Sequence, residues 1–178
     1  MTAATNNDSL EALAQLASRC GIAAEYADVW GKPHATSART LSALLAAMHF
    51  PADADPAELL REIEEREWRR KVVAELSRPD GAHSLSFSAG IDRPLLERTI
   101  FVMQTWVHDL LRLKNASEPR HHVDCVPALK AKARRARLER LLALDRELLE
   151  ARRLVSHPLN ARLAAEHLMM AYNRATLA

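Results

Sequence analysis

The sequence contains few glycines and few tyrosines. Its 178 residues include four glycines and two tyrosines, in a chain rich in leucine, alanine, arginine and glutamate. Such a composition is typical of helical proteins, because glycine is unfavourable inside helices while the abundant residues are good helix formers. The sequence therefore predicts an all-α fold.

Cysteine and long apolar runs are also scarce. Cys20 and Cys125 are too few for a disulfide framework, so we expect reduced thiols in a cytoplasmic protein. No uncharged apolar stretch reaches the roughly 18 residues of a membrane span. The N-terminus lacks the basic-then-apolar order of a secretory signal. These features predict a cytoplasmic chain with no membrane partner.

Motifs for common enzyme chemistry are missing as well. The glycines at 21, 31, 81 and 90 do not form a phosphate-binding loop, and no G-x-S-x-G, H-E-x-x-H or C-x-x-C occurs. The sequence therefore predicts no catalytic residue, no cofactor-binding residue and no metal ligand.

The charge divides the chain into two parts. Residues 1–90 carry 9 basic and 13 acidic side chains, net −4, whereas residues 91–178 carry 16 and 10, net +6. Two halves of opposite character suggest two structural units.

Three helices are expected in the N-terminal unit, residues 1–76. After a frayed end at 1–8, the first helix spans residues 9–20 and ends at Gly21, which suits the C′ position. Ser37 starts the second helix, and Asp55-Pro56 starts the third, which runs to about residue 76. Trp30 and Trp68 each end a helical pattern with apolar neighbours, so we expect both in or beside the core of this unit.

Residues 77–91 are expected to form a linker. This segment is rich in serine and barely periodic; a loop is favoured, and a short strand at Leu85 and Phe87 is the alternative.

A helical bundle is expected at residues 92–178. Asp92-Arg93-Pro94 opens a helix to about residue 114, and a loop follows to residue 126. Pro127 opens a basic helix, and leucines mark another helix at 138–154. Asp145 and Arg152 fall inside its apolar stripe, so each should meet a partner on a neighbouring helix or at a subunit interface.

The last helix is expected to begin at Pro158, with Ser156 or His157 as its cap. At 100° per residue it presents two apolar stripes, which one neighbour cannot cover. It should therefore lie inside a bundle or between subunits. The candidate core or interface residues are Leu159, Leu163, Leu168, Met170 and Tyr172, together with Trp106 in the earlier helix.

A motif near the end of the sequence reads His157-Pro158-Leu159-Asn160-Ala161-Arg162-Leu163, and an acid and an apolar run to Tyr172 follow it. This motif resembles the extreme C-terminus of the bacterial DNA polymerase III delta prime subunit. The segments 106–111 and 118–122 fit the same region in order. The resemblance covers roughly residues 91–178. It implies a helical collar domain that holds a clamp-loader ring together through protein subunits, without catalysis.

Residues 9–71 resemble a second family. This region contains Gly21-Ile22, then a Tyr, an Asp and Trp-Gly, then Ser37-x-x-Thr40-Leu41 and the segment 66–70. In this order the motifs are similar to the N-terminal helical region of bacterial 4-alpha-glucanotransferases (amylomaltases). The catalytic barrel of that family needs on the order of 250 residues, and no residue here takes its catalytic roles. The whole chain thus looks chimeric.

Three groups of side chains offer chemistry. His121, His122 and Cys125 are metal-ligand types, with His108 or Asp124 to complete a set, but a polar loop is favoured. Trp30, Trp68 and Tyr26 could stack on sugar rings, but core positions are favoured. A basic run could form a weak nucleic-acid patch, although a solvated helix surface is favoured; its members are Lys130, Lys132, Arg134, Arg135 and Arg137.

The first functional hypothesis is therefore a non-catalytic assembly module of the delta prime collar type in DNA replication, binding protein subunits or self-associating. The alternatives are an accessory module of a glucan-processing enzyme, or a fusion of two fragments with no activity of its own.

Overall fold

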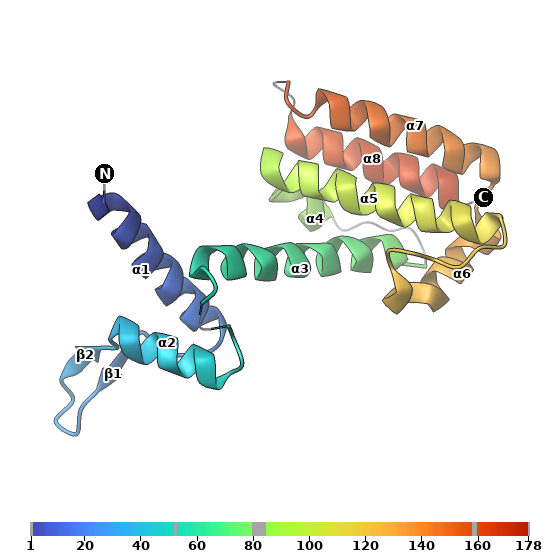
Figure 1. Cartoon of the computed structure of the whole chain (residues 1–178). Coiled ribbons are helices and arrows are strands. Elements are labelled where there is room, and N and C mark those ends of the chain that lie inside the picture. The colour runs from blue at the N-terminus through green and yellow to red at the C-terminus, as the bar shows by residue number, and fades with distance from the viewer. Residues whose placement is uncertain (1, 52, 80–84, 158–159, 178) are drawn as a thin grey trace. The chain divides into compact units, whose positions relative to one another are not determined.

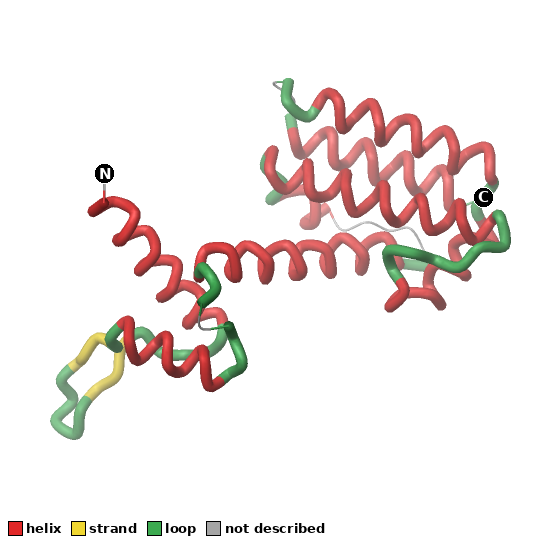
Figure 2. Tube along the Cα trace, viewed as in Figure 1, coloured by secondary structure: helices red, strands yellow, loops and turns green. Residues whose placement is uncertain are grey.

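The computed structural model of the chain is mostly helical (Figures 1 and 2). It describes residues 2–51, 53–79, 85–157 and 160–177. The prediction of a helical fold is confirmed, with one two-stranded sheet in the described part of the chain. Within those residues, no helix has the length and apolar character needed to cross a membrane.

The chain forms two compact units that divide between Arg66 and Glu67, inside helix α3 (Pro56–Ser77). The first half of α3 contributes Leu59 and Ile63 to the N-terminal core, and the second half buries Val72 and Leu76 in the C-terminal core. The division therefore lies upstream of the 77–91 linker expected from the sequence, because apolar contacts continue to the end of this helix.

The N-terminal unit packs α1 (Thr2–Arg19) against α2 (Ala38–Ala47). Its core is formed by Leu13, Leu16, Ala17, Leu41 and Leu45. The Ser37 side chain accepts from the Thr40 amide, as an N-cap should, and Gly21 has the positive φ of +79° predicted for it. The frayed end predicted at 1–8 is wrong, since α1 begins at Thr2.

A short β-hairpin, β1 (Glu25–Ala27) with β2 (Pro33–Ala35), follows α1 and was missed from the sequence. Asp28 closes its turn: one carboxylate oxygen accepts from the Trp30 and Lys32 amides, and the other bonds to His34 Nε2. These hydrogen bonds, that with His34 first, lower the pKa of Asp28. Trp30 lies on this turn and is 87% exposed, so its predicted core position is wrong.

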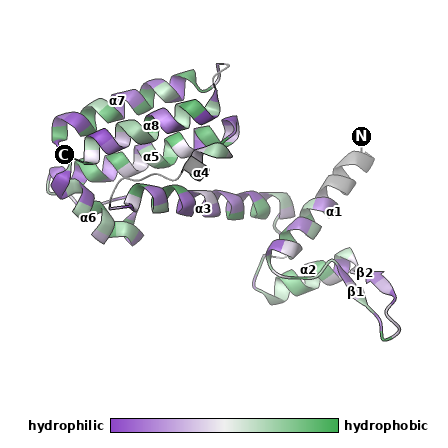
Figure 3. Ribbon diagram, turned by 180° about the vertical axis from the view of Figure 1, so that it is seen from behind, coloured by the Kyte–Doolittle hydropathy of each residue, from purple (hydrophilic) through white to green (hydrophobic). Residues whose placement is uncertain are grey.

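The C-terminal unit is built around α5 (Arg93–Lys114), which packs against α6 (Val126–Arg135), α7 (Leu138–Leu154) and α8 (Ala161–Thr176). Asp92 caps α5 as expected, accepting from the Leu95 amide. A short helix α4 (Leu85–Ala89) replaces the predicted loop, and a 3₁₀ turn η1 (Val123–Cys125) precedes α6. Hydrophilic and hydrophobic residues are interspersed along α7 and α8, as in amphipathic helices (Figure 3).

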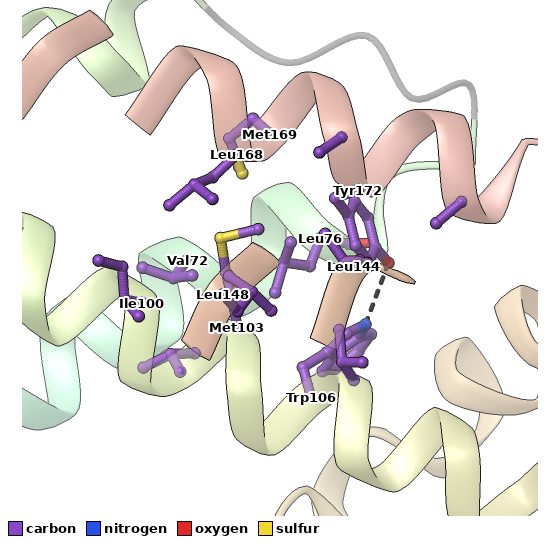
Figure 4. Close-up of a cluster of buried hydrophobic side chains, with 14 of the residues drawn as sticks. Val72, Leu76, Ile100, Met103, Trp106, Leu144, Leu148, Leu168, Met169 and Tyr172 are labelled. Atoms are coloured by element: carbon purple, nitrogen blue, oxygen red, sulfur yellow. Dashed lines mark hydrogen bonds between the residues drawn. The ribbon is translucent and has the colours of Figure 1, made fainter. Parts of the chain in front are cut away.

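The core of this unit joins α3, α5, α7 and α8 (Figure 4). Trp68 belongs to it rather than to the N-terminal core: its Nε1 donates to Thr99, and its ring stacks on Phe87 with centroids 5.6 Å apart. The prediction that Trp68 packs is therefore right, but the unit named for it is wrong. On α7, Arg152 donates to Gln104 of α5, while Asp145 is half-buried.

Candidate functional site

Helix α8 begins later than the sequence suggested. Asn160 is its N-cap, with the side-chain oxygen accepting from the Leu163 amide 3.1 Å away. Neither Ser156 nor His157 caps it, because an amide side chain three residues before Leu163 satisfies the helix end directly. Pro158 and Leu159, which the motif placed in the first turn, lie outside the described residues.

The inner face of α8 is anchored by a buried aromatic pair. The Tyr172 hydroxyl accepts from Trp106 Nε1 at 3.0 Å (Figure 4). It also donates to the Leu76 carbonyl at 2.8 Å, so three helices share one hydroxyl. Leu168 is buried beside them. Burial raises the pKa of Tyr172, so the hydroxyl stays neutral and can serve as donor and acceptor at once.

The outer face of α8 remains exposed. Leu163 is 59% exposed and Met170 is 60% exposed, so within this chain neither belongs to the core. The sequence offered a core or an interface position for Leu163; within this chain α5 and α7 pack against α8 and Leu168 is buried, while Leu163 is not. The interface position for these two residues stays a prediction.

Leu163→Ala is expected to change the unfolding free energy of the single chain by less than about 0.5 kcal/mol, since little apolar area is lost. Leu168→Ala, on the inner face of the same helix, should cost about 2–5 kcal/mol. Urea denaturation of both variants at low protein concentration tests this. Equal destabilisation by the two changes would contradict the assignment of faces.

The basic run of α6 is smaller than its sequence suggested. Lys132 is buried, and its ammonium donates to the Arg78 carbonyl and lies 5.6 Å from the Tyr172 ring centroid. Arg135 donates to the Pro79 carbonyl. Lys130, Arg134 and Arg137 are exposed. The run therefore partly fixes the end of α3, and a nucleic-acid patch on it would rest on fewer cations.

A loop latch, defined here as Asp109 with the backbone of residues 120–122, ties the loop after α5 to that helix. The Asp109 carboxylate is fully buried and accepts from the amides of Arg120 at 2.7 Å, His121 at 3.0 Å and His122 at 2.8 Å. Burial raises the pKa of Asp109, but these bonds outweigh it and leave the pKa below its ordinary value. The carboxylate therefore stays charged and holds the loop.

The side chain of His122, a residue of this loop, is buried, and both of its ring nitrogens have a partner. Nδ1 is 3.0 Å from an Arg69 nitrogen and Nε2 is 3.0 Å from the Thr105 hydroxyl. Because arginine can only donate, the proton of the neutral ring sits on Nε2. Arg69 also pairs with Asp124. His121, His122 and Cys125 therefore do not converge on one point; instead, His121 lies with His108 and Asp109.

The neutral state of His122 predicts a pH dependence. Burial first, and Arg69 second, lower its pKa to about 4, whereas Asp109 and Asp124 oppose this. The unfolded chain protonates this ring near pH 6.5, so stability should fall as pH drops from 6.5 to 4, by at most about 3 kcal/mol. Urea midpoints across this range should show the loss, and His122→Asn should flatten it. His157→Gln, at an exposed histidine, is the control and should keep the pH dependence of the parent. If the urea midpoint of His122→Asn falls with pH as steeply as in this control, His122 is not the cause.

No protein-family model, no curated protein and no solved structure matches the chain.

Proposed function

We propose that the chain is a non-catalytic helical assembly module whose C-terminal unit binds other protein subunits. The observation that carries this is the outer face of α8, where Leu163 and Met170 stay about three-fifths exposed. Large side chains that project together from a helix otherwise packed on its inner face are typical of a surface covered by another chain. The resemblance of residues 91–178 to the delta prime collar names the partner class: clamp-loader subunits in DNA replication.

Helix α7 carries a second row of exposed apolar side chains. Leu138, Leu142 and Leu149 fall within 40° of one another around that helix and are 41%, 43% and 45% exposed. Leu141, Leu144 and Leu148, centred about 100° further around the helix, fill the core. An apolar row on each of two adjacent helices suits contact with further helices, as in a collar.

Mixing the chain with purified bacterial clamp-loader subunits, and measuring mass by light scattering after size exclusion, tests the proposal. A complex should form with the parent and be lost in Leu163→Gln/Met170→Gln, while Phe101→Gln, at an exposed apolar side chain on α5, should retain it. If the chain stays monomeric at every concentration and mixture, the proposal fails. If the chain associates only with itself, the assembly role is retained and clamp-loader subunits are excluded as its partners.

A second candidate function, glucan binding, is favoured by the aromatics of the hairpin. Tyr26 is 59% exposed and stacks on His34, and the Trp30 indole projects from the turn. A hollow of about 520 Å³ beside Tyr26 is lined by Thr36, Leu44 and their neighbours. Exposed aromatic rings, Tyr26 beside the hollow and Trp30 on the turn, provide apolar platforms of the kind on which sugar rings stack.

Retention on an amylose column distinguishes this candidate. Trp30→Ala should abolish retention and leave thermal stability unchanged, because the indole contributes little to packing. Quenching of indole fluorescence by maltooligosaccharides in the parent, absent in the variant, gives a second measurement. A parent chain that elutes with the void would exclude glucan binding at the hairpin.

A further inference from the structure

Two exposed histidines and a buried carboxylate meet where the loop after α5 turns back over that helix. His108 and Asp109 are consecutive on α5, and His121 belongs to the loop before η1. One ligand-type atom of each residue lies within 4.8 Å of the other two. His108 Nδ1 is 4.0 Å from Asp109 Oδ1, and the two imidazole rings meet edge to face with centroids 5.2 Å apart.

The loop latch fixes this arrangement. The His121 amide donates to Asp109, so the backbone of one histidine is bound to the residue that follows the other. The His108 side chain is 48% exposed, and His121 is exposed as well. An ion can therefore reach both imidazoles from solvent without opening the helix or the loop.

The donors suit a particular class of ion. Two imidazole nitrogens and a carboxylate oxygen are ligands preferred by divalent zinc, nickel, copper and iron, whereas magnesium and calcium prefer oxygen alone. Metal–ligand bonds of about 2.0–2.1 Å bring neighbouring donors to about 3.0–3.5 Å from each other. The present donors lie within 4.8 Å of one another, so a bound ion would require the exposed histidine side chains to rotate inward.

Neighbouring groups are less suitable as ligands. Both ring nitrogens of His122 already face Arg69 and Thr105. The Asp124 carboxylate pairs with Arg69, and burial raises the pKa of the Cys125 thiol, which disfavours the thiolate that a metal needs. In the described part of the chain, His108 and His121 thus offer two exposed imidazoles side by side, and the buried Asp109 Oδ1 beside them also accepts from the amides of Arg120 and His121.

We infer that His108 and His121, with Asp109 Oδ1 as third donor, bind one divalent first-row transition metal ion. The remaining coordination positions would be filled by water. A bound ion would join α5 to the loop at a second point beside the latch. This site is independent of the subunit contacts proposed for α8.

Calorimetric titration of the full chain with zinc chloride and nickel chloride, after treatment with a chelator and its removal, tests the site. The parent should bind one ion per chain. His108→Ala and His121→Ala should each lower the affinity at least tenfold, and the double variant should show no saturable binding. His157→Ala removes an exposed histidine elsewhere and should match the parent. Asp109 stays unchanged because it also holds the loop.

The melting temperature gives a second measurement of metal binding. Zinc should raise the melting temperature of the parent, a chelator should reverse the rise, and the double variant should show neither effect. If His108→Ala proves unfolded by circular dichroism, His108→Gln replaces it. A parent that binds no ion, or a folded double variant that binds as tightly as the parent, would overturn the inference.

Discussion

Trp106→Ala is expected to lower the unfolding free energy of the C-terminal unit by about 3–5 kcal/mol, which is a large share of the stability of a small domain. The indole is fully buried in the centre of the core and contacts His122 edge to face at 5.2 Å. Its loss leaves a cavity and also removes the donor to Tyr172. Chemical denaturation monitored by circular dichroism measures the change.

Trp30→Ala makes the same substitution at an exposed indole and serves as the matched control; it should be neutral. Tyr172→Phe separates packing from hydrogen bonding, because the ring remains while the Trp106 indole N–H and the Leu76 carbonyl lose their shared partner. We expect about 1–3 kcal/mol for that loss. If Trp106→Ala and Trp30→Ala lower the unfolding free energy by the same amount, Trp106 does not lie at the centre of the core.

Local signals were sufficient for most helix boundaries. A capping side chain acts within three residues, so Ser37, Asp55 and Asp92 could be identified without tertiary structure; the Asp55 carboxylate indeed accepts from the Ala57 amide. The positive φ at Gly21 is equally local. The start of α8 was missed because two local signals competed: Pro158 suits a first turn, and Asn160 suits a cap.

Burial was harder to predict because it depends on distant partners. Helical periodicity gives α8 two apolar stripes, but only the packing of α5 and α7 decides that Leu168 is covered and Leu163 is not. Lys132 looks like a solvated cation in the sequence, but its ammonium donates to the carbonyl of Arg78, 54 residues away, and such a partner makes its burial tolerable. The hairpin was missed because strands of three residues have no clear period.

The loop latch could have been suspected from one feature of the sequence. Asp109 follows Trp106 by three residues and precedes Leu110, so it lies on the apolar face of α5. A charge on such a face needs partners, and a helix cannot supply them from its own amides. What could not be foreseen is that the backbone of residues 120–122 supplies them. Loop conformation depends on tertiary contacts and is not encoded by periodicity.

Replacing Asp109 with alanine should therefore have the second large effect, a loss of about 3–5 kcal/mol from the C-terminal unit. Three backbone amides would lose their acceptor, each at a cost of about 1–3 kcal/mol, reduced where water enters. The loop would also detach from α5, so amide hydrogen exchange at residues 120–122 should accelerate beyond the change in global stability.

Asp109→Asn provides the sharper test, because it keeps the shape and replaces one acceptor oxygen by a donating amide nitrogen. That nitrogen would face amides that also donate, so asparagine should recover less than half of the lost stability even though its volume is the same. Asp53→Ala, the same deletion at an exposed position, should leave the denaturation midpoint unchanged. If Asp109→Asn behaves like the parent, the carboxylate is a space-filling group rather than the acceptor that holds the loop.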